Sequence, residues 1–309
     1  MRELMALLSR PAFDGYPDEY LLARLKGRRA NLGRERQSPA AAGGMTDADA
    51  WDPMRSEFRW VYRQMNEGLR QTFAPLFLWF ELRTIILCLR FRRGGERGKA
   101  ASLLPASLLA KPVQQALTED GEPAAVMDAL SGLLAAVTEQ YRSLGDFYRE
   151  RGGREHEQRL VTLYLERMTA LPLHPLLREF FRSLIDMRNL VTLAKQLRWQ
   201  LREPQAFIRG GEITPERLGK VLEEGTAAGL ATLLAAVPDI GALPAAPFNP
   251  EPQLFSWLTG KVRRLGRVPL GVGLVLDYLW RCFVEAHNLS LMIHGEGLDH
   301  ETLSAELIR

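Results

Sequence analysis

Residue types that commonly carry out catalysis are present in this sequence, but their spacing matches no catalytic pattern that we can identify. Residues 93–100 come nearest to a phosphate-binding loop, yet arginine stands in place of its first glycine and alanine in place of its hydroxyl residue. The five histidines include no His-Glu-x-x-His pair, and the paired carboxylates of a helical-bundle enzyme are absent. We therefore expect no catalytic residues, no metal site, no cofactor and no small-molecule substrate.

Acidic side chains recur in another setting, on the apolar faces of expected helices. The pattern apolar–acid–x–x–(Asn or Thr)–apolar occurs three times, at intervals of about 100 residues. We call its acid and amide residues the repeat motif, and they are Glu81, Asp186, Asn189, Glu285 and Asn288. The first copy has Thr84 where the other two have asparagine. At about 100° per residue, each acid shares a helix face with apolar side chains.

A carboxylate on an apolar face is costly to bury unless an arginine, a helix N-terminus or another hydrogen-bond donor partners it. Two interpretations stay open at this point. Either each acid lies at the margin of its stripe and reaches water, or each forms a structural pair with an arginine, for which Arg24 and Arg28 are candidates in the first copy. The role is structural in both cases.

The elements that position the motif are helices. Apolar residues recur at i, i+3, i+4 and i+7, and prolines and glycines separate the segments. The segments with this spacing are 123–150, 155–170, 175–201, 215–237 and 271–294. Strand-like alternation is nearly absent, so the sequence predicts an all-α fold. Residues 33–52 are low in apolar content and are expected to form a mobile loop.

The same interval appears outside the motif. The block at 130–137 (LSGLLAAV) resembles the block at 230–237 (LATLLAAV), in the same order relative to the motif. A duplicated unit of about 100 residues therefore predicts three similar helical-bundle domains. Their expected ranges are 1–120, 121–222 and 223–309.

The composition is that of an ordinary globular chain. The 309 residues include 40 Lys+Arg and 37 Asp+Glu, a formal net charge of +3, which argues against a generic nucleic-acid binder. Two cysteines exclude a disulfide scaffold and favour a reduced, cytosolic setting. Charged residues interrupt the most apolar stretch, 75–91, so we expect no membrane span, while peripheral attachment stays open.

Several of these features together resemble one family, the C (or d) subunit of rotary V/A-type ATPases. Residues 20–28 (YLLARLKGR) are similar to its first helix, 186–190 (DMRNL) to its acid–x–x–Asn–Leu helix, and 207–213 (FIRGGEI) to its Gly-Gly connection. The resemblance extends from about Tyr16 to Arg309, and it rests on order and repetition rather than on a single specific motif. The first copy departs from the pattern because no Gly-Gly follows Leu103-Leu104.

The resemblance implies both a fold and a role. It implies three helical domains in a funnel with pseudo-threefold symmetry. It also implies a non-catalytic central-stalk subunit that joins the rotor shaft, made of coiled-coil D-type and F-type subunits, to the membrane proteolipid ring and transmits torque. The chain would then lie in the cytoplasm, peripheral on the inner face of the membrane. An unrelated all-α scaffold or adaptor is the alternative, and the transported ion and the direction of ATP turnover stay open.

Basic clusters follow or precede the motif helices. Under the family interpretation, some of them would meet acidic loops of the ring or anionic headgroups; otherwise they are solvated helix ends. The candidate partner-binding residues are Arg90, Arg92, Arg93, Arg198, Arg263 and Arg264.

Overall fold

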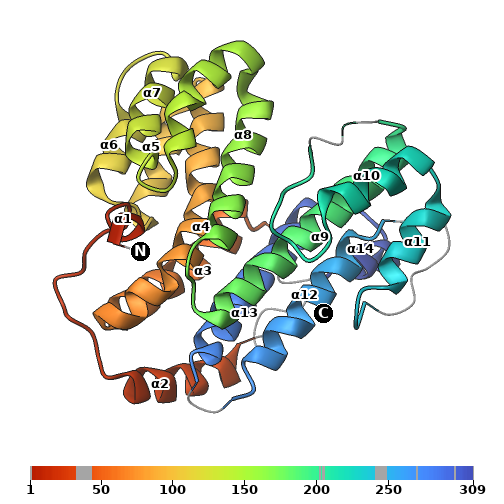
Figure 1. The fold of residues 1–309 in the computed structure, drawn as a ribbon. Helices are drawn as coiled ribbons and strands as arrows, with labels where there is room; N and C mark the ends of the chain where they lie inside the picture. The colour runs from red at the N-terminus through yellow and green to blue at the C-terminus, as the bar shows by residue number, and fades with distance from the viewer. Residues whose placement is uncertain are drawn as a thin grey trace. The chain divides into compact units, whose positions relative to one another are not determined.

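The regular elements of the protein are helices (Figure 1). The computed structural model describes residues 2–32, 44–201, 203, 206–240, 249–268, 271–295 and 297–308. Within these ranges, the β contact is an isolated antiparallel bridge between Leu8 and Leu109. The predicted all-α fold is confirmed.

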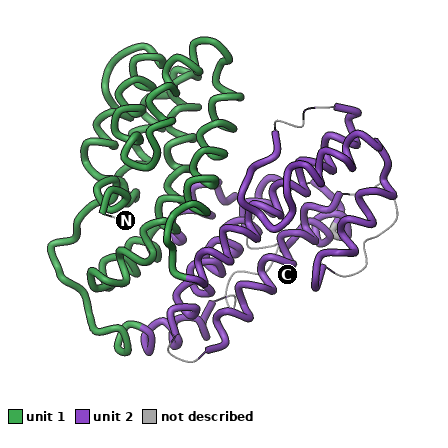
Figure 2. Tube along the Cα trace, viewed as in Figure 1, with its two compact units in different colours: residues 1–21, 55–174 green, residues 22–54, 175–309 purple. Residues whose placement is uncertain are grey.

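The chain divides into two compact units (Figure 2). Unit 1 comprises residues 1–21 and 55–174, and unit 2 comprises residues 22–54 and 175–309. The three domains expected from the repeat, 1–120, 121–222 and 223–309, stay a prediction. Helix α3 begins at Asp47, so the expected loop at 33–52 is wrong for its last residues, while residues 33–43 lie outside the described ranges.

Unit 1 is built around one long helix. Its helices are α1 (Arg2–Met5), most of α3 (Asp47–Gln64), α4 (Glu67–Arg93), α5 (Arg97–Leu103), α6 (Lys111–Thr118), α7 (Pro123–Leu134) and α8 (Leu144–Ala170), with short 3-10 helices at Leu104–Ala106 and Glu139–Ser143. Helix α4 starts where the Asn66 side chain accepts a hydrogen bond from the backbone N–H of Leu69. This helix is long and apolar enough to span a bilayer, but 67% of its most apolar window is buried in the protein, as expected of a core helix.

Unit 2 contains the other two copies of the motif. Its helices are most of α2 (Asp18–Asn31), the start of α3, α9 (Pro175–Trp199), α10 (Pro215–Glu224), α11 (Ala227–Ala235), α12 (Glu251–Leu265), α13 (Gly273–His294) and α14 (His300–Glu306). Helix α10 begins at Thr214, whose side chain accepts from the N–H of Arg217. The expected continuous helix at 215–237 is interrupted at Gly225, which adopts the left-handed conformation (φ 67°).

Helix α2 is tied to α13 by a buried carboxylate that the sequence did not single out. The Asp277 side chain is fully buried. It forms ion pairs with Arg29 of α2 at 2.9 Å and with Arg281, one turn along α13, at 3.0 Å. Arg29 also donates to the carbonyl of Gly266 at 3.1 Å. Asp277 is outside the repeat motif, so the repeat gave no reason to predict that it is buried.

Candidate functional site

The first acid of the repeat motif, Glu81, lies on the buried face of α4 and is 8% exposed. The hydroxyl of Ser107 donates to one carboxylate oxygen at 2.7 Å, and the backbone N–H of Leu108 donates to the other at 2.6 Å. Burial raises the pKa of Glu81, and these hydrogen bonds oppose the shift. The carboxylate therefore holds the chain that follows the 3-10 helix Leu104–Ala106 against α4.

The second acid, Asp186, repeats this arrangement on α9. The N–H of Ile213 donates to one carboxylate oxygen at 2.9 Å and the N–H of Glu212 to the other at 3.1 Å. In both copies the donors lie 26 and 27 residues after the acid. Burial raises the pKa of Asp186 to about 6, again against the hydrogen bonds.

The first copy has a glutamate and the second an aspartate, and the glycines at 210 and 211 explain this difference in side-chain length. Gly210 adopts φ 101°, and a Cβ placed on Gly211 would overlap the Asp186 carboxylate. The glycines therefore let the backbone come close enough for an aspartate to reach it. No Gly-Gly precedes Ser107, so the first copy uses glutamate, which is one methylene longer, together with a side-chain hydroxyl.

The asparagines of the motif make a second type of contact. The Asn189 amide donates to the carbonyl of Ile208 and accepts from its N–H, both at 2.8 Å. Asn288 does the same with Ile308, at 2.8 and 2.9 Å. Each asparagine thus satisfies both backbone groups of one residue, as a neighbouring β-strand would. In the first copy, Thr84 instead hydrogen-bonds the Glu81 carboxylate.

Both interpretations offered for the acids are wrong for Glu81 and Asp186. Both side chains are buried, and their hydrogen-bond donors are backbone N–H groups and the hydroxyls of Ser107 and Thr84 rather than an arginine. Arg28, a candidate partner, donates instead to the Tyr278 hydroxyl within unit 2 at 3.3 Å. Glu285 of the third copy is half-buried. The donor segments carried no sequence signal except the Gly-Gly pair.

The arginines proposed as partner contacts lie in different environments. Arg92 is buried and donates to the carbonyls of Leu117, Glu119 and Gly121, which ties α4 to the end of α6. Because its guanidinium serves this internal role, we do not retain Arg92 as a partner contact.

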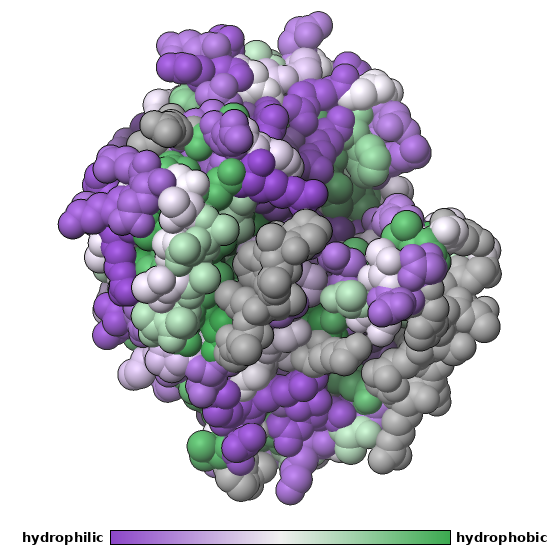
Figure 3. Space-filling model, turned by 90° about the vertical axis from the view of Figure 1, so that its right-hand side faces the viewer, coloured by the Kyte–Doolittle hydropathy of each residue, from purple (hydrophilic) through white to green (hydrophobic). Residues whose placement is uncertain are grey.

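The other candidate arginines are exposed. Arg90 and Arg93 both form ion pairs with Glu157 at 2.6 Å, and Arg264 pairs with Asp239 at 2.9 Å. Arg198 lies in the last turn of α9 and Arg263 in that of α12. Figure 3 shows hydrophilic residues beside a hydrophobic area on one face of the molecule.

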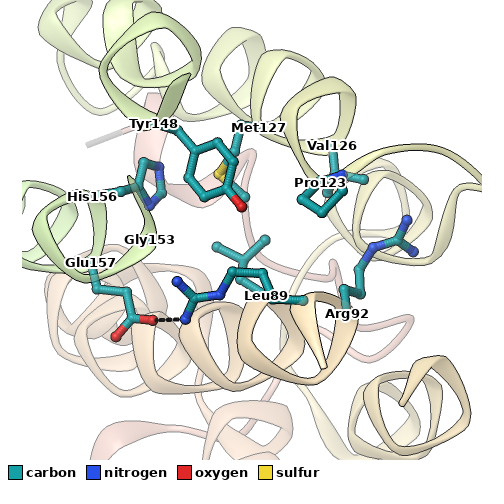
Figure 4. A pocket seen from close by; sticks show the side chains of 10 residues that line it. Leu89, Arg92, Pro123, Val126, Met127, Tyr148, Gly153, His156 and Glu157 are labelled. Atoms are coloured by element: carbon teal, nitrogen blue, oxygen red, sulfur yellow. Dashed lines mark hydrogen bonds and ion pairs between the residues drawn. The ribbon is translucent and has the colours of Figure 1, made fainter. Parts of the chain in front are cut away.

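A small cavity of about 10 Å³ in unit 1 lies beside His156 and Glu157 (Figure 4). The His156 ring meets the Tyr148 ring edge to face at 5.6 Å, and its Nε2 atom is buried without a hydrogen-bond partner. Burial lowers the pKa of His156 to about 4. The volume suits at most one water molecule, so we assign the cavity no ligand.

The buried histidine predicts a pH dependence of stability. The pKa of His156 is near 4 in the folded state and 6.5 in the unfolded state. The contribution of the neutral ring to the stability of the fold is therefore complete above pH 6.5, and it is lost as the pH falls towards 4. Between pH 7 and 4.5 the loss is about 2 kcal/mol. Urea unfolding of the wild type and of His156→Gln at both pH values measures it. The variant should lose about 2 kcal/mol less than the wild type over this interval, and equal losses would contradict the assignment.

The side chains of the repeat motif hold backbone segments in place and do not form a reaction site. Among the described residues, no group of three or more His, Cys, Asp or Glu side chains could hold a metal ion. The carboxylates of Glu81 and Asp186 are engaged by donors from their own unit. This arrangement attaches the connecting segments to the long helices through hydrogen bonds.

Comparison with known proteins places the chain in a family. No curated protein matches the sequence. The model of one family, described as ATP synthase (C/AC39) subunit, matches residues 46–303, a range that includes all three copies of the repeat motif. The chain belongs to the ATP synthase (C/AC39) subunit family of V/A-type rotary ATPases.

Proposed function

We propose that this protein is the non-catalytic central-stalk subunit that couples the rotor shaft to the membrane proteolipid ring. The observation that carries the proposal is the family match over residues 46–303. Family membership also argues against the alternative of an unrelated all-α scaffold or adaptor. In this role the protein transmits torque between shaft and ring during ATP-linked transport of protons or sodium ions.

The contacts of the repeat motif support a mechanical role. A part that transmits torque must resist local opening, and local opening begins where few buried contacts hold the backbone. The acid contacts of Glu81 and Asp186 and the amide contacts of Asn189 and Asn288 join long helices to later connections. They hold irregular connections of each unit against its long helices.

The proposal includes three similar domains around a central opening, with the shaft, through its D-type and F-type subunits, on one side and the ring on the other. The protein then lies on the cytoplasmic side of the membrane as a peripheral subunit. Its candidate contacts with acidic loops or headgroups are the exposed residues Arg90, Arg93, Arg198, Arg263 and Arg264.

Affinity purification from the native cell tests this assignment. A tagged chain, expressed at its natural level and extracted with the membranes in mild detergent, should bring down shaft and proteolipid subunits in fixed ratio. The same tag on an unrelated peripheral protein is the control. Recovery of the tagged chain without either class of subunit would overturn the proposal.

A further inference from the structure

We propose that a groove in unit 1 binds an acidic, extended peptide segment of a partner protein. The groove has a volume of about 710 Å³, and its described lining residues belong to unit 1. It is bordered by the chain that follows α1, by the end of α3, and by the segment from Leu104 to Gln114. This surface is separate from the arginines considered above.

The charge of the groove is of one sign. Among the residues that the structure describes, four cationic side chains line it and no carboxylate does. These cations are Arg10, Arg59, Arg63 and Lys111. A concave site lined by one sign of charge concentrates its field and attracts groups of opposite charge. The nearest motif acid, Glu81, is buried and engaged with Ser107 and Leu108, so it fixes the position of two lining residues.

One wall of the groove is extended chain held in place from both ends. At one end, the N–H of Ser9 donates to the carbonyl of Leu108 at 2.7 Å. At the other, the N–H of Tyr16 donates to the carbonyl of Gln64 at 2.9 Å. Between them, Arg70 donates to the carbonyl of Phe13 at 2.6 Å. The wall, which is the red chain after α1 in Figure 1, is therefore pre-formed for binding.

The groove also offers apolar contact and a hydroxyl group without a hydrogen-bond partner. Phe13 is 48% exposed and its ring meets that of Tyr16 at 5.0 Å. Tyr62, which also lines the groove, has a buried hydroxyl with no hydrogen-bond partner, and such groups normally find one. Aromatic rings beside cations suit a peptide that alternates acidic and apolar side chains. A bilayer surface would instead meet cations on a convex face.

Fluorescence anisotropy with labelled eight-residue peptides tests the proposal on the full chain. The probe is (Asp-Leu)4, and (Asn-Leu)4 is its uncharged match. We expect the wild type to bind (Asp-Leu)4 more tightly than (Asn-Leu)4, with affinity that falls as salt rises. The double variant Arg10→Glu/Lys111→Glu should weaken binding about tenfold. Both changes are at exposed positions, and glutamate suits the first turn of α6, so the fold should be kept.

The matched control is Arg151→Glu/Arg154→Glu, which makes the same change in net charge at exposed positions of α8. It should bind (Asp-Leu)4 as the wild type does. Equal weakening by the two double variants would overturn the proposal, as would equal binding of the two peptides. Sedimentation with phosphatidylserine vesicles tests whether the groove binds a membrane instead. If the wild type sediments, the groove variant does not, and no peptide binds, the groove is a membrane contact and the peptide proposal is wrong.

Discussion

Replacing Asp186 by alanine is expected to lower the free energy of unfolding by about 2–4 kcal/mol at pH 7. The change leaves the N–H groups of Glu212 and Ile213 without their acceptors, and Ile213 is buried. A buried donor without a partner costs more than the hydrogen bond contributes when made. Urea unfolding followed by circular dichroism measures the loss.

The size of this loss should depend on pH. Because the pKa of Asp186 is raised to about 6 from 3.8, protonation stabilises the folded wild type; this contribution is complete below pH 3.8 and is lost as the pH rises through 6. The difference between wild type and variant should therefore be about 1 kcal/mol larger at pH 5 than at pH 7. A difference that shrinks on acidification would show that the carboxylate is held by a favourable charge partner instead.

A double-mutant cycle that combines Asp186→Ala with Gly211→Ala measures how much the close approach of the Gly211 backbone to the Asp186 carboxylate contributes. In the wild type the added methyl group must displace the Asp186 carboxylate from its donors, which should cost about 1–3 kcal/mol. In the Asp186→Ala background the carboxylate is gone and the methyl group of Ile185, at 3.1 Å, is the remaining close contact, so the same change should cost less. Additive effects would mean that Gly211 is needed for another reason.

Replacing Asn189 by alanine is expected to have a comparable effect, about 2–4 kcal/mol. The side chain is 1% exposed and serves both backbone groups of Ile208, so one truncation leaves a buried donor and a buried acceptor unpaired. Asn189→Asp keeps the acceptor but removes the donor, and it should also destabilise. The same urea titrations measure both variants.

Asn288 provides the matched comparison because its geometry with Ile308 is the same and its burial is less. Since water can replace the lost partners there, Asn288→Ala should cost about half as much as Asn189→Ala. If Asn288→Ala lowered the free energy of unfolding more than Asn189→Ala does, burial would not be what determines the contribution of these contacts to stability.

The sequence predicted the acceptors of these contacts but not their donors. The spacing of apolar residues placed Glu81 and Asp186 on buried helix faces, and both are buried. Apart from hydroxyl groups at Glu81, their donors are the backbone N–H groups of Leu108, Glu212 and Ile213, which lie 26 or 27 residues after the acid. Every residue except proline offers such a group, so side-chain identity carries little signal. The expectation of an arginine partner failed for this reason.

Helix boundaries were predicted less well than helix faces. Residues 123–150 have continuous helical spacing, yet α7 ends at Leu134 and a 3-10 helix precedes α8. Apolar residues on both sides of this break pack inwards, among them Leu134, Val137 and Tyr141, so the spacing alone cannot locate the interruption. Arg92 shows the same limit, because a basic residue at a helix end serves either solvent or nearby carbonyls.

Coupling between ATP hydrolysis and ion transport tests the central claim most directly. Membrane vesicles that contain the rotary complex are prepared from cells with and without the gene for this chain, and both activities are measured, with the purified chain added back as the control. We predict that vesicles lacking the chain keep a residual ATP hydrolysis but lose ATP-driven ion transport, and that adding the chain restores transport. Transport that stays proportional to hydrolysis without the chain would contradict its role as the coupling subunit.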